Sequence, residues 1–136
     1  MKITSLSTAG THVRPDGVAM TEFFSAAEGA KVTMGHAVFP AGTVVPWAAH
    51  DADEYAFILR GSVSCETEED GLLSMTAGGA SFIPAGQRHS SRNDGPEESR
   101  AHLSWWKNRS RGPAPWQSGR FYQPSLRRGR GYVEVI

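Results

Sequence analysis

The chain has 136 residues, a length that suits one domain with a single buried core. Its 14 basic side chains balance its 14 acidic ones, so no net charge attracts nucleic acid or an anionic membrane. Its single cysteine, Cys65, excludes a disulfide within the chain. We find no apolar run typical of a signal peptide or a membrane-spanning helix. We therefore expect a cytoplasmic protein that binds neither membrane nor nucleic acid.

Short β-strands are the elements that most of the sequence predicts. The run from Met20 to Ala30 fits either a short helix that ends at Gly29 or a strand followed by a turn. After it, β-branched and aromatic residues occur in short runs bounded by glycine and proline, a pattern typical of strands. These runs are residues 31–39, 54–61, 62–68, 78–86 and 99–106. An Asp-Gly pair within residues 68–73 predicts a hairpin. Strands spaced this closely indicate an all-β sandwich or barrel.

The composition changes near the end of the chain. Residues 107–120 are basic and rich in glycine and proline, so we predict a loop there, and residues 132–136 predict a last strand. The arginines within 127–130 form a short basic run without interleaved aromatic residues. We interpret this run as a solvated loop and not as a nucleic-acid site. No repeat or linker divides the chain, and we predict a single domain over residues 1–136.

Two histidines and one glutamate stand where a fold of this kind could bring them together. His50 and Glu54 are four residues apart, across a short turn between two strands. An antiparallel neighbour can bring the carboxylate of Glu54 back beside His50. His89 follows a Pro-x-Gly turn that would direct it into the same cavity. Imidazole and carboxylate groups suit a first-row divalent metal ion.

The segments around these residues resemble the two sequence motifs of cupins. Positions that fit the first motif, within residues 42–61, are Gly42, His50, Glu54 and Gly61. Ala48 stands where that motif has its first histidine. Positions that fit the second motif, within residues 78–93, are Gly78, Pro84, Gly86, His89 and Asn93. The resemblance implies a cupin fold, a double-stranded β-helix or jelly-roll-like barrel of two antiparallel sheets, with a site inside its mouth.

The resemblance also implies a metal site and its ligands. Cupins typically bind one metal ion through three histidines and a glutamate, and His50, Glu54 and His89 correspond to two of these histidines and the glutamate. We predict these three residues as metal ligands and catalytic residues. A set of two histidines and one carboxylate suits Fe(II), but it does not distinguish iron from manganese, nickel, copper or zinc. His36 and His102, on flanking strands, are possible extra ligands; His102 would enter the site only if its strand turned its polar face inward.

Further side chains are predicted to contact a substrate or a second subunit. The pocket candidates are Trp47, Ala48, Arg60 and Trp105. An indole ring could stack on a flat or apolar substrate, and an arginine could steer an anionic one. Tyr55, Phe57 and Leu59 share the strand face opposite to Glu54. Because small cupins are commonly dimers, we expect this apolar stripe at a homodimer interface, with packing inside one chain as the equal alternative.

Three functional hypotheses follow. The leading one is a metal-dependent cupin enzyme that acts on a small organic molecule, with dioxygenase or other oxidoreductase chemistry slightly favoured. The alternative is a non-catalytic, metal-free cupin that binds or senses a small ligand, in which Ala48 marks a lost metal site. A further alternative is an isomerase or cyclase, such as a polyketide cyclase. The fold alone does not choose among these activities.

Overall fold

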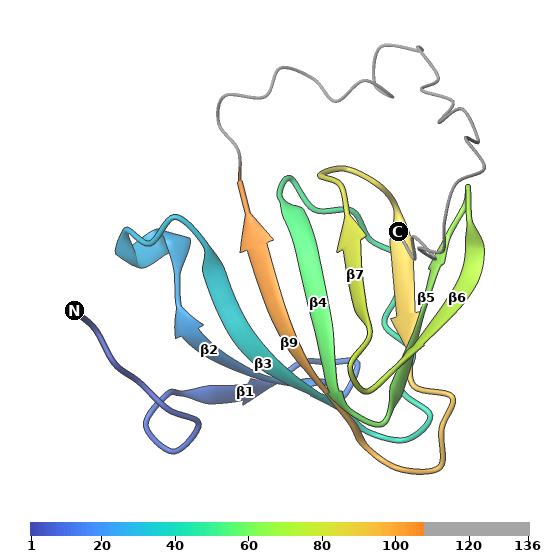
Figure 1. Cartoon of the computed structure of the whole chain (residues 1–136), viewed down its shortest axis with the longest axis horizontal. Coiled ribbons are helices and arrows are strands. Elements are labelled where there is room, and N and C mark those ends of the chain that lie inside the picture. The colour runs from blue at the N-terminus through green and yellow to red at the C-terminus, as the bar shows by residue number, and fades with distance from the viewer. Residues whose placement is uncertain (108–136) are drawn as a thin grey trace.

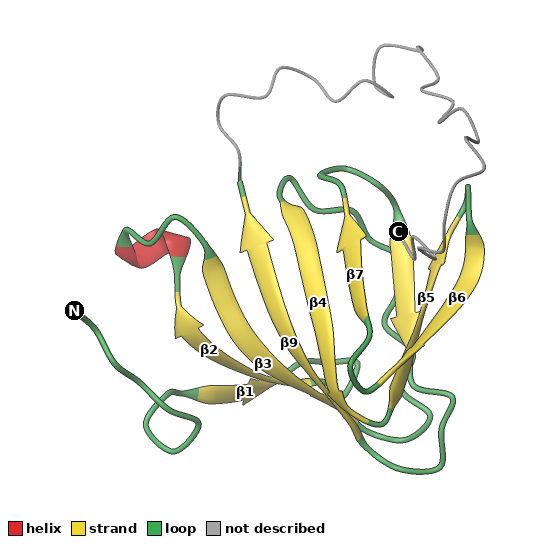
Figure 2. Cartoon of the chain, viewed as in Figure 1, coloured by secondary structure: helices red, strands yellow, loops and turns green. Residues whose placement is uncertain are grey.

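The computed structural model describes residues 1–107. The predicted strand at 132–136, the arginine run at 127–130 and all but the first residue of the predicted loop at 107–120 lie outside the described residues. Within the described part, the chain is almost entirely β-structure, and a single 3-10 turn is its only helical element (Figure 2). No helix in residues 1–107 is long and apolar enough to cross a membrane.

The described residues form nine strands in two antiparallel sheets (Figure 1). In chain order the elements are β1 (Thr11–Val13), β2 (Ala19–Phe24), the 3-10 turn η1 (Ala26–Glu28), β3 (Thr33–Phe39), β4 (Asp53–Arg60), β5 (Ser62–Thr67), β6 (Gly71–Thr76), β7 (Ala80–Ile83), β8 (His89–Arg92) and β9 (Ser99–Trp106). The larger sheet has the order β1-β2-β3-β9-β4-β7, and the smaller has the order β6-β5-β8. The prediction of an all-β fold with two antiparallel sheets is confirmed.

Each of the five predicted strand runs contains a strand, and the ambiguous run after Met20 is a strand followed by a turn. Its helical tendency is limited to η1, where the Ser25 side chain accepts a hydrogen bond from the Ala27 amide. Gly29 ends the turn at a φ of 90°, a conformation that residues with a side chain rarely adopt. Two strands, β1 and β8, were not predicted, because they are three and four residues long and lack an apolar alternation.

Apolar side chains from both sheets fill the space between them. The buried cluster comprises Val18, Met20, Ala37, Phe39, Ile58, Val63, Met75, Ala101 and Leu103. In β9, Ala101 and Leu103 face inward, and their cross-strand neighbours in β4 are Ile58 and Ala56. Full burial of a side chain such as Ile58 contributes about 1.5–3 kcal/mol to stability. This packing decides which face of β4 and β9 points into the cavity.

The two motif segments lie side by side. The segment before β4 runs antiparallel to β8, with bridges at Val44 and Ala48 to Arg92 and His89. Asn93, the last motif residue, is fully buried, and its side-chain amide donates to the carbonyls of Phe39, Pro40 and Glu97. Residues that are far apart in the sequence are therefore fastened to one another along β8 and beyond its end.

Candidate metal centre

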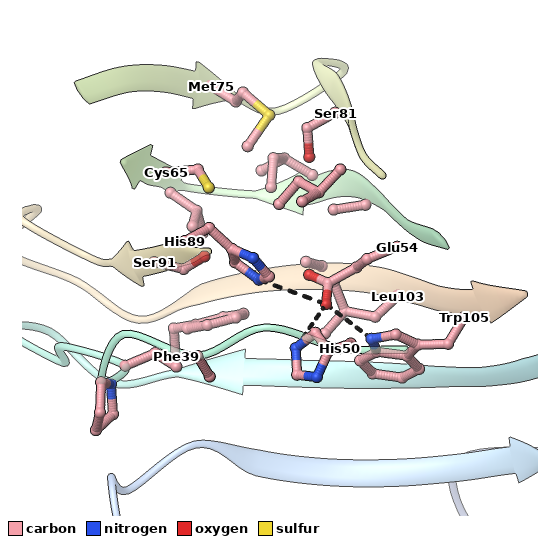
Figure 3. A pocket seen from close by; sticks show the side chains of 18 of the residues that line it. Phe39, His50, Glu54, Cys65, Met75, Ser81, His89, Ser91, Leu103 and Trp105 are labelled. Atoms are coloured by element: carbon pink, nitrogen blue, oxygen red, sulfur yellow. Dashed lines mark hydrogen bonds and ion pairs between the residues drawn. The ribbon is translucent and has the colours of Figure 1, made fainter. Parts of the chain in front are cut away.

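His50, Glu54 and His89 come together at one end of the cavity between the sheets (Figure 3). The Glu54 Oε2 atom lies 3.3 Å from His50 Nε2 and 3.7 Å from His89 Nε2. The three potential ligand atoms all lie within 4.8 Å of one another. Within residues 1–107, this is the only group of three or more histidine, cysteine or acidic side chains that could hold one ion.

The cross-strand register places the Glu54 carboxylate. Glu54 stands near the start of β4, between Ile83 of β7 and Trp105 of β9, on the inward face. Trp105 donates its indole N–H to Glu54 Oε2 over 2.7 Å. A buried carboxylate is costly unless it has partners, and here two imidazoles and one indole supply them. The indole bond fixes the oxygen that faces both histidines.

A tight turn and a backbone carbonyl orient His89. Gln87 donates its amide to the Pro84 carbonyl, and Gly86 has a φ of 83°, which closes the turn that the Pro-x-Gly pattern predicts. The His89 ring is buried, with Nδ1 3.0 Å from the Gln87 carbonyl oxygen. With the proton on Nδ1 and donated to that carbonyl, the Nε2 lone pair points to the space beside Glu54.

His50 lies on the exposed loop before β4, and backbone contacts tie this loop to the turn before His89. The His50 carbonyl accepts the Gly86 amide over 2.6 Å. Asp53 accepts the Ala85 amide through Oδ1 over 3.0 Å. The loop that carries the first imidazole and the turn that directs the second therefore hold each other in place.

Charges at the centre are set by competition between burial and hydrogen bonding. Burial alone raises the pKa of Glu54, but hydrogen bonds from His50, His89 and Trp105 outweigh it and lower this pKa to about 2. Burial lowers the pKa of His89, but Glu54 and the Gln87 carbonyl outweigh burial and raise it. The carboxylate is therefore negative at neutral pH, and a proton on His89 competes with a metal ion.

The three donors fit one first-row divalent ion. At metal–ligand distances of about 2.0–2.2 Å, neighbouring ligand atoms are about 3.0 Å apart around an octahedral ion and about 3.4 Å apart around a tetrahedral one. The separations of 3.3 and 3.7 Å between Glu54 and the two histidines need small side-chain adjustments to meet these values, and the two imidazole nitrogens, which lie within 4.8 Å of each other, would have to move closer where they exceed them. An ion held by these three donors would keep further coordination positions for water or a substrate.

Ala48 occupies the position opposite His89. The two residues exchange backbone hydrogen bonds, with the Ala48 amide 3.0 Å from the His89 carbonyl and the reverse bond at 2.9 Å. Residues paired in this way direct their side chains to the same face, and Ala48 lines the cavity. The histidine of the motif would therefore reach the centre from this position, and the alanine methyl leaves that space open.

The cavity beside the centre has a mostly apolar wall. Its volume is about 80 Å³, and it opens to solvent. Its apolar lining includes Phe39, Val45, Ile58, Val63, Met75 and Leu103. Arg14, from the loop between β1 and β2, also lines it, and sequence patterns did not identify this residue because the three-residue strand before it is too short to show alternation.

The structure separates the four predicted pocket candidates. Ala48 and Trp105 line the cavity, but Trp47 and Arg60 do not belong to its wall. The Trp47 ring is exposed, and the Arg88 guanidinium lies 5.9 Å from its centroid. Arg60 pairs with Glu97 at the surface. Trp47 and Arg60 are therefore not among the residues that line this cavity, and their contact with a substrate stays a prediction.

The two possible extra ligands lie on the other side of the large sheet. His36 and His102 are opposite each other in the β3–β9 pair. Their neighbours Ala37 and Ala101 point inward into the core, so the two histidines point outward. His102 bonds through Nε2 to the Ser104 hydroxyl over 2.8 Å. Neither histidine belongs to the cluster around Glu54, because the apolar faces of both strands turn toward the core.

The outer face of β4 carries the predicted apolar stripe. Tyr55, Phe57 and Leu59 are 38%, 43% and 50% exposed. The Tyr55 ring lies 5.0 Å from that of Phe82 on the neighbouring strand. The homodimer remains a prediction, and a mass measurement by analytical ultracentrifugation checks it.

Comparison with known proteins agrees with this architecture. The solved structures that the chain resembles include the polyketide cyclase RemF from Streptomyces resistomycificus, with a TM-score of 0.70, 16% identity and 82% coverage of both chains. A predicted oxalate decarboxylase from Thermotoga maritima has a TM-score of 0.66 and 20% identity, with 77% of this chain and 98% of that one covered. The Cnp3 cupin domain of Schizosaccharomyces pombe has a TM-score of 0.65 and 20% identity, with 76% and 72% covered.

At these identities the solved structures show the fold alone. No curated protein matches the chain in sequence. A family model described as a cupin domain matches residues 35–106, which span β3 to β9 and include all three residues of the candidate centre. The chain therefore belongs to the cupin-domain family.

Proposed function

We propose that this cupin is a metal-dependent enzyme that acts on a small organic molecule. The observation that carries the proposal is the convergence of His50, Glu54 and His89, with all three ligand atoms within 4.8 Å of one another at the end of a mostly apolar cavity. One divalent ion held there would supply Lewis acidity or, in the case of iron, oxygen chemistry.

The residues around the centre have distinct roles in this proposal. Glu54 supplies the negative charge, and its pKa of about 2 keeps it ionised across the physiological range. Trp105 holds the Glu54 carboxylate in one orientation, and the Gln87 carbonyl holds the His89 ring. The apolar wall excludes water and binds the body of the substrate next to the open positions.

Two reaction classes agree with this arrangement. Two histidines and one carboxylate, with open positions beside them, favour an oxidoreductase of the dioxygenase type. A cyclase or isomerase is the alternative that the apolar cavity favours, because such a wall suits a flat, ring-containing molecule. The structural likeness to a polyketide cyclase agrees with that alternative but concerns the fold.

Metal analysis tests the proposal. The protein is purified without chelator, its metal content is measured by mass spectrometry, and Mn(II), Fe(II), Ni(II), Cu(II) and Zn(II) are titrated by calorimetry. We expect one ion per chain in the wild type and loss of that ion in His89→Ala. The matched control is His102→Ala, which removes an imidazole from the outer face and should retain the metal.

A second candidate function rests on Ala48. This residue removes one imidazole from the position opposite His89 and leaves space where cupins typically have a ligand. A folded wild-type protein that takes up none of the five ions would contradict the metal-dependent enzyme. That result would favour a cupin that binds a small molecule without catalysis.

A further inference from the structure

We propose that Arg14 determines specificity in this cavity, and that the molecule bound there is an aromatic or alicyclic acid whose carboxylate pairs with Arg14 while its apolar body extends toward the metal centre. The proposal rests on the proposed function only in taking this cavity as the binding site.

The strand register places Arg14 at the end of the cavity opposite to the metal centre. The Arg14 amide donates to the Val18 carbonyl, which continues the β1–β2 pairing to the level of Phe39 at the end of β3. Trp105, which holds Glu54, pairs with Thr33 at the start of the same strand. Six residues at about 3.3 Å each separate these two levels by roughly 20 Å of backbone.

The wall between the two ends carries no other permanent charge. Arg14 is the only lysine or arginine among the described lining residues, and Glu54 is the only acid among them. Apolar side chains and the neutral polar groups of Cys65, Ser81 and Ser91 lie between. An elongated ligand with one anionic end is therefore oriented by the lining itself, because Glu54 repels that end and Arg14 attracts it.

A buried acid holds the Arg14 guanidinium without using all of its donors. Arg14 Nη2 lies 2.6 Å from Asp16 Oδ2, while Asp16 Oδ1 accepts the Val18 amide. The Asp16 side chain is only 7% exposed, whereas that of Arg14 is 37% exposed. A guanidinium has five N–H donors, and in residues 1–107 Asp16 is its only side-chain partner. The remaining donors can bind a carboxylate in the bidentate manner that arginine favours.

A purely structural role for the Arg14–Asp16 pair predicts a different response to substitution. If the pair only closed the loop between β1 and β2, loss of Arg14 would weaken every ligand of the cavity equally. If Arg14 binds the acid group, its loss should affect charged ligands and spare neutral ligands of the same shape. A matched pair of probes therefore separates the two roles.

The probes are 2-naphthoate and 2-naphthamide, which have the same ring system and differ in charge. Both are titrated by calorimetry into the full chain after chelator treatment, so that no metal can bind the carboxylate. We expect naphthoate to bind at least about tenfold more tightly than the amide, the effect of one charge-assisted hydrogen-bonded pair. Arg14→Gln should abolish this ratio, and Arg14→Lys should retain part of it.

Two further variants serve as controls. Asp16→Asn releases the guanidinium and should tighten naphthoate while leaving the amide unchanged. Arg60→Gln removes a surface guanidinium outside the cavity and should change neither probe. Circular dichroism verifies that each variant is folded, and Arg14→Lys keeps the test decisive if Arg14→Gln does not fold.

The proposal is overturned if Arg14→Gln and Arg14→Lys weaken both probes equally, or if neither probe binds the folded wild type. Its failure can be distinguished from failure of the proposed function. If the protein binds naphthoate more tightly than naphthamide but binds no metal, only the proposal of a metal-dependent enzyme is contradicted. If it binds metal but binds the two probes equally, only the proposed role of Arg14 is contradicted.

Discussion

Histidines lie on both sides of the large sheet, and the buried histidine on each side has the opposite shift in pKa. On the inner side, His89 is buried beside Glu54, and the carboxylate raises its pKa despite burial. On the outer face, His36 is also buried, but burial and the nearby Arg100 lower its pKa. Burial alone therefore lowers the pKa of a histidine, and a carboxylate in contact with the ring reverses that shift. The proposed metal centre depends on this carboxylate.

The largest effect on the difference between the inner and the outer histidines should come from removal of the Glu54 carboxylate. Glu54→Gln should reduce affinity for Zn(II) by roughly 100- to 1000-fold, because structural zinc sites gain about 10–16 kcal/mol over four ligands, or about 2.5–4 kcal/mol per ligand. The control is Glu98→Gln, which removes an acid near His36 and should leave affinity unchanged. Calorimetry measures both variants, and equal Zn(II) affinities would show that Glu54 is not a ligand.

Acid titration of the metal-free protein should show how much the ionised Glu54 carboxylate of the inner site contributes to the free energy of unfolding. The pKa of Glu54 is lowered from 4.5 to about 2 in the folded state, so its stabilisation is present above pH 4.5 and is lost as the pH falls toward 2. At about 1.4 kcal/mol per pKa unit, the loss is on the order of 3 kcal/mol. Urea unfolding of wild type and Glu54→Gln between pH 5 and 2 checks this, and parallel pH profiles would refute it.

Restoring the missing imidazole should strengthen the inner site. Ala48 faces the same side as His89, so Ala48→His places a third ring at the centre, and we expect metal affinity to rise about 10- to 100-fold. Ala49→His is the matched control, because the next side chain along the segment points to the other side. An equal gain in metal affinity in both variants would mean that the position of the added histidine does not matter, which would contradict this prediction.

Loss of the indole donor should have the smallest effect. Trp105→Phe removes the hydrogen bond to Glu54 Oε2 and keeps an aromatic ring, so metal affinity should fall about tenfold. The neighbouring Trp106 is exposed, and Trp106→Phe should leave the affinity unchanged. If calorimetry gives the same metal affinity for the two variants, the hydrogen bond from Trp105 does not orient the Glu54 carboxylate.

Local patterns in the sequence were sufficient to predict part of the site. Alternation along β4 predicts that Glu54 opposes the face of Tyr55 and Phe57, and the structure has this arrangement. The Pro-x-Gly pattern predicts the turn before His89, and Gly86 closes that turn. Motif spacing identifies Ala48 as the substituted position, and the cavity lining includes it.

Features that depend on long-range pairing could not be predicted in the same way. Glu54 and Trp105 are 51 residues apart, and only the β4–β9 register brings them into contact. Arg14 reaches the cavity through the pairing of β1 with β2 and of β2 with β3. The direction of His102 depends on which face of β9 meets the core, a choice that its own alternation leaves open.

The place of β9 between β3 and β4 has a consequence for how the molecule folds. β3 and β4 have no pairing with each other, and β9, the last described strand, joins them. During synthesis the large sheet therefore cannot close until residues 99–106 have emerged from the ribosome. Such distant pairing favours slow folding, and the Glu54 carboxylate can meet its indole partner only after β9 has been synthesised.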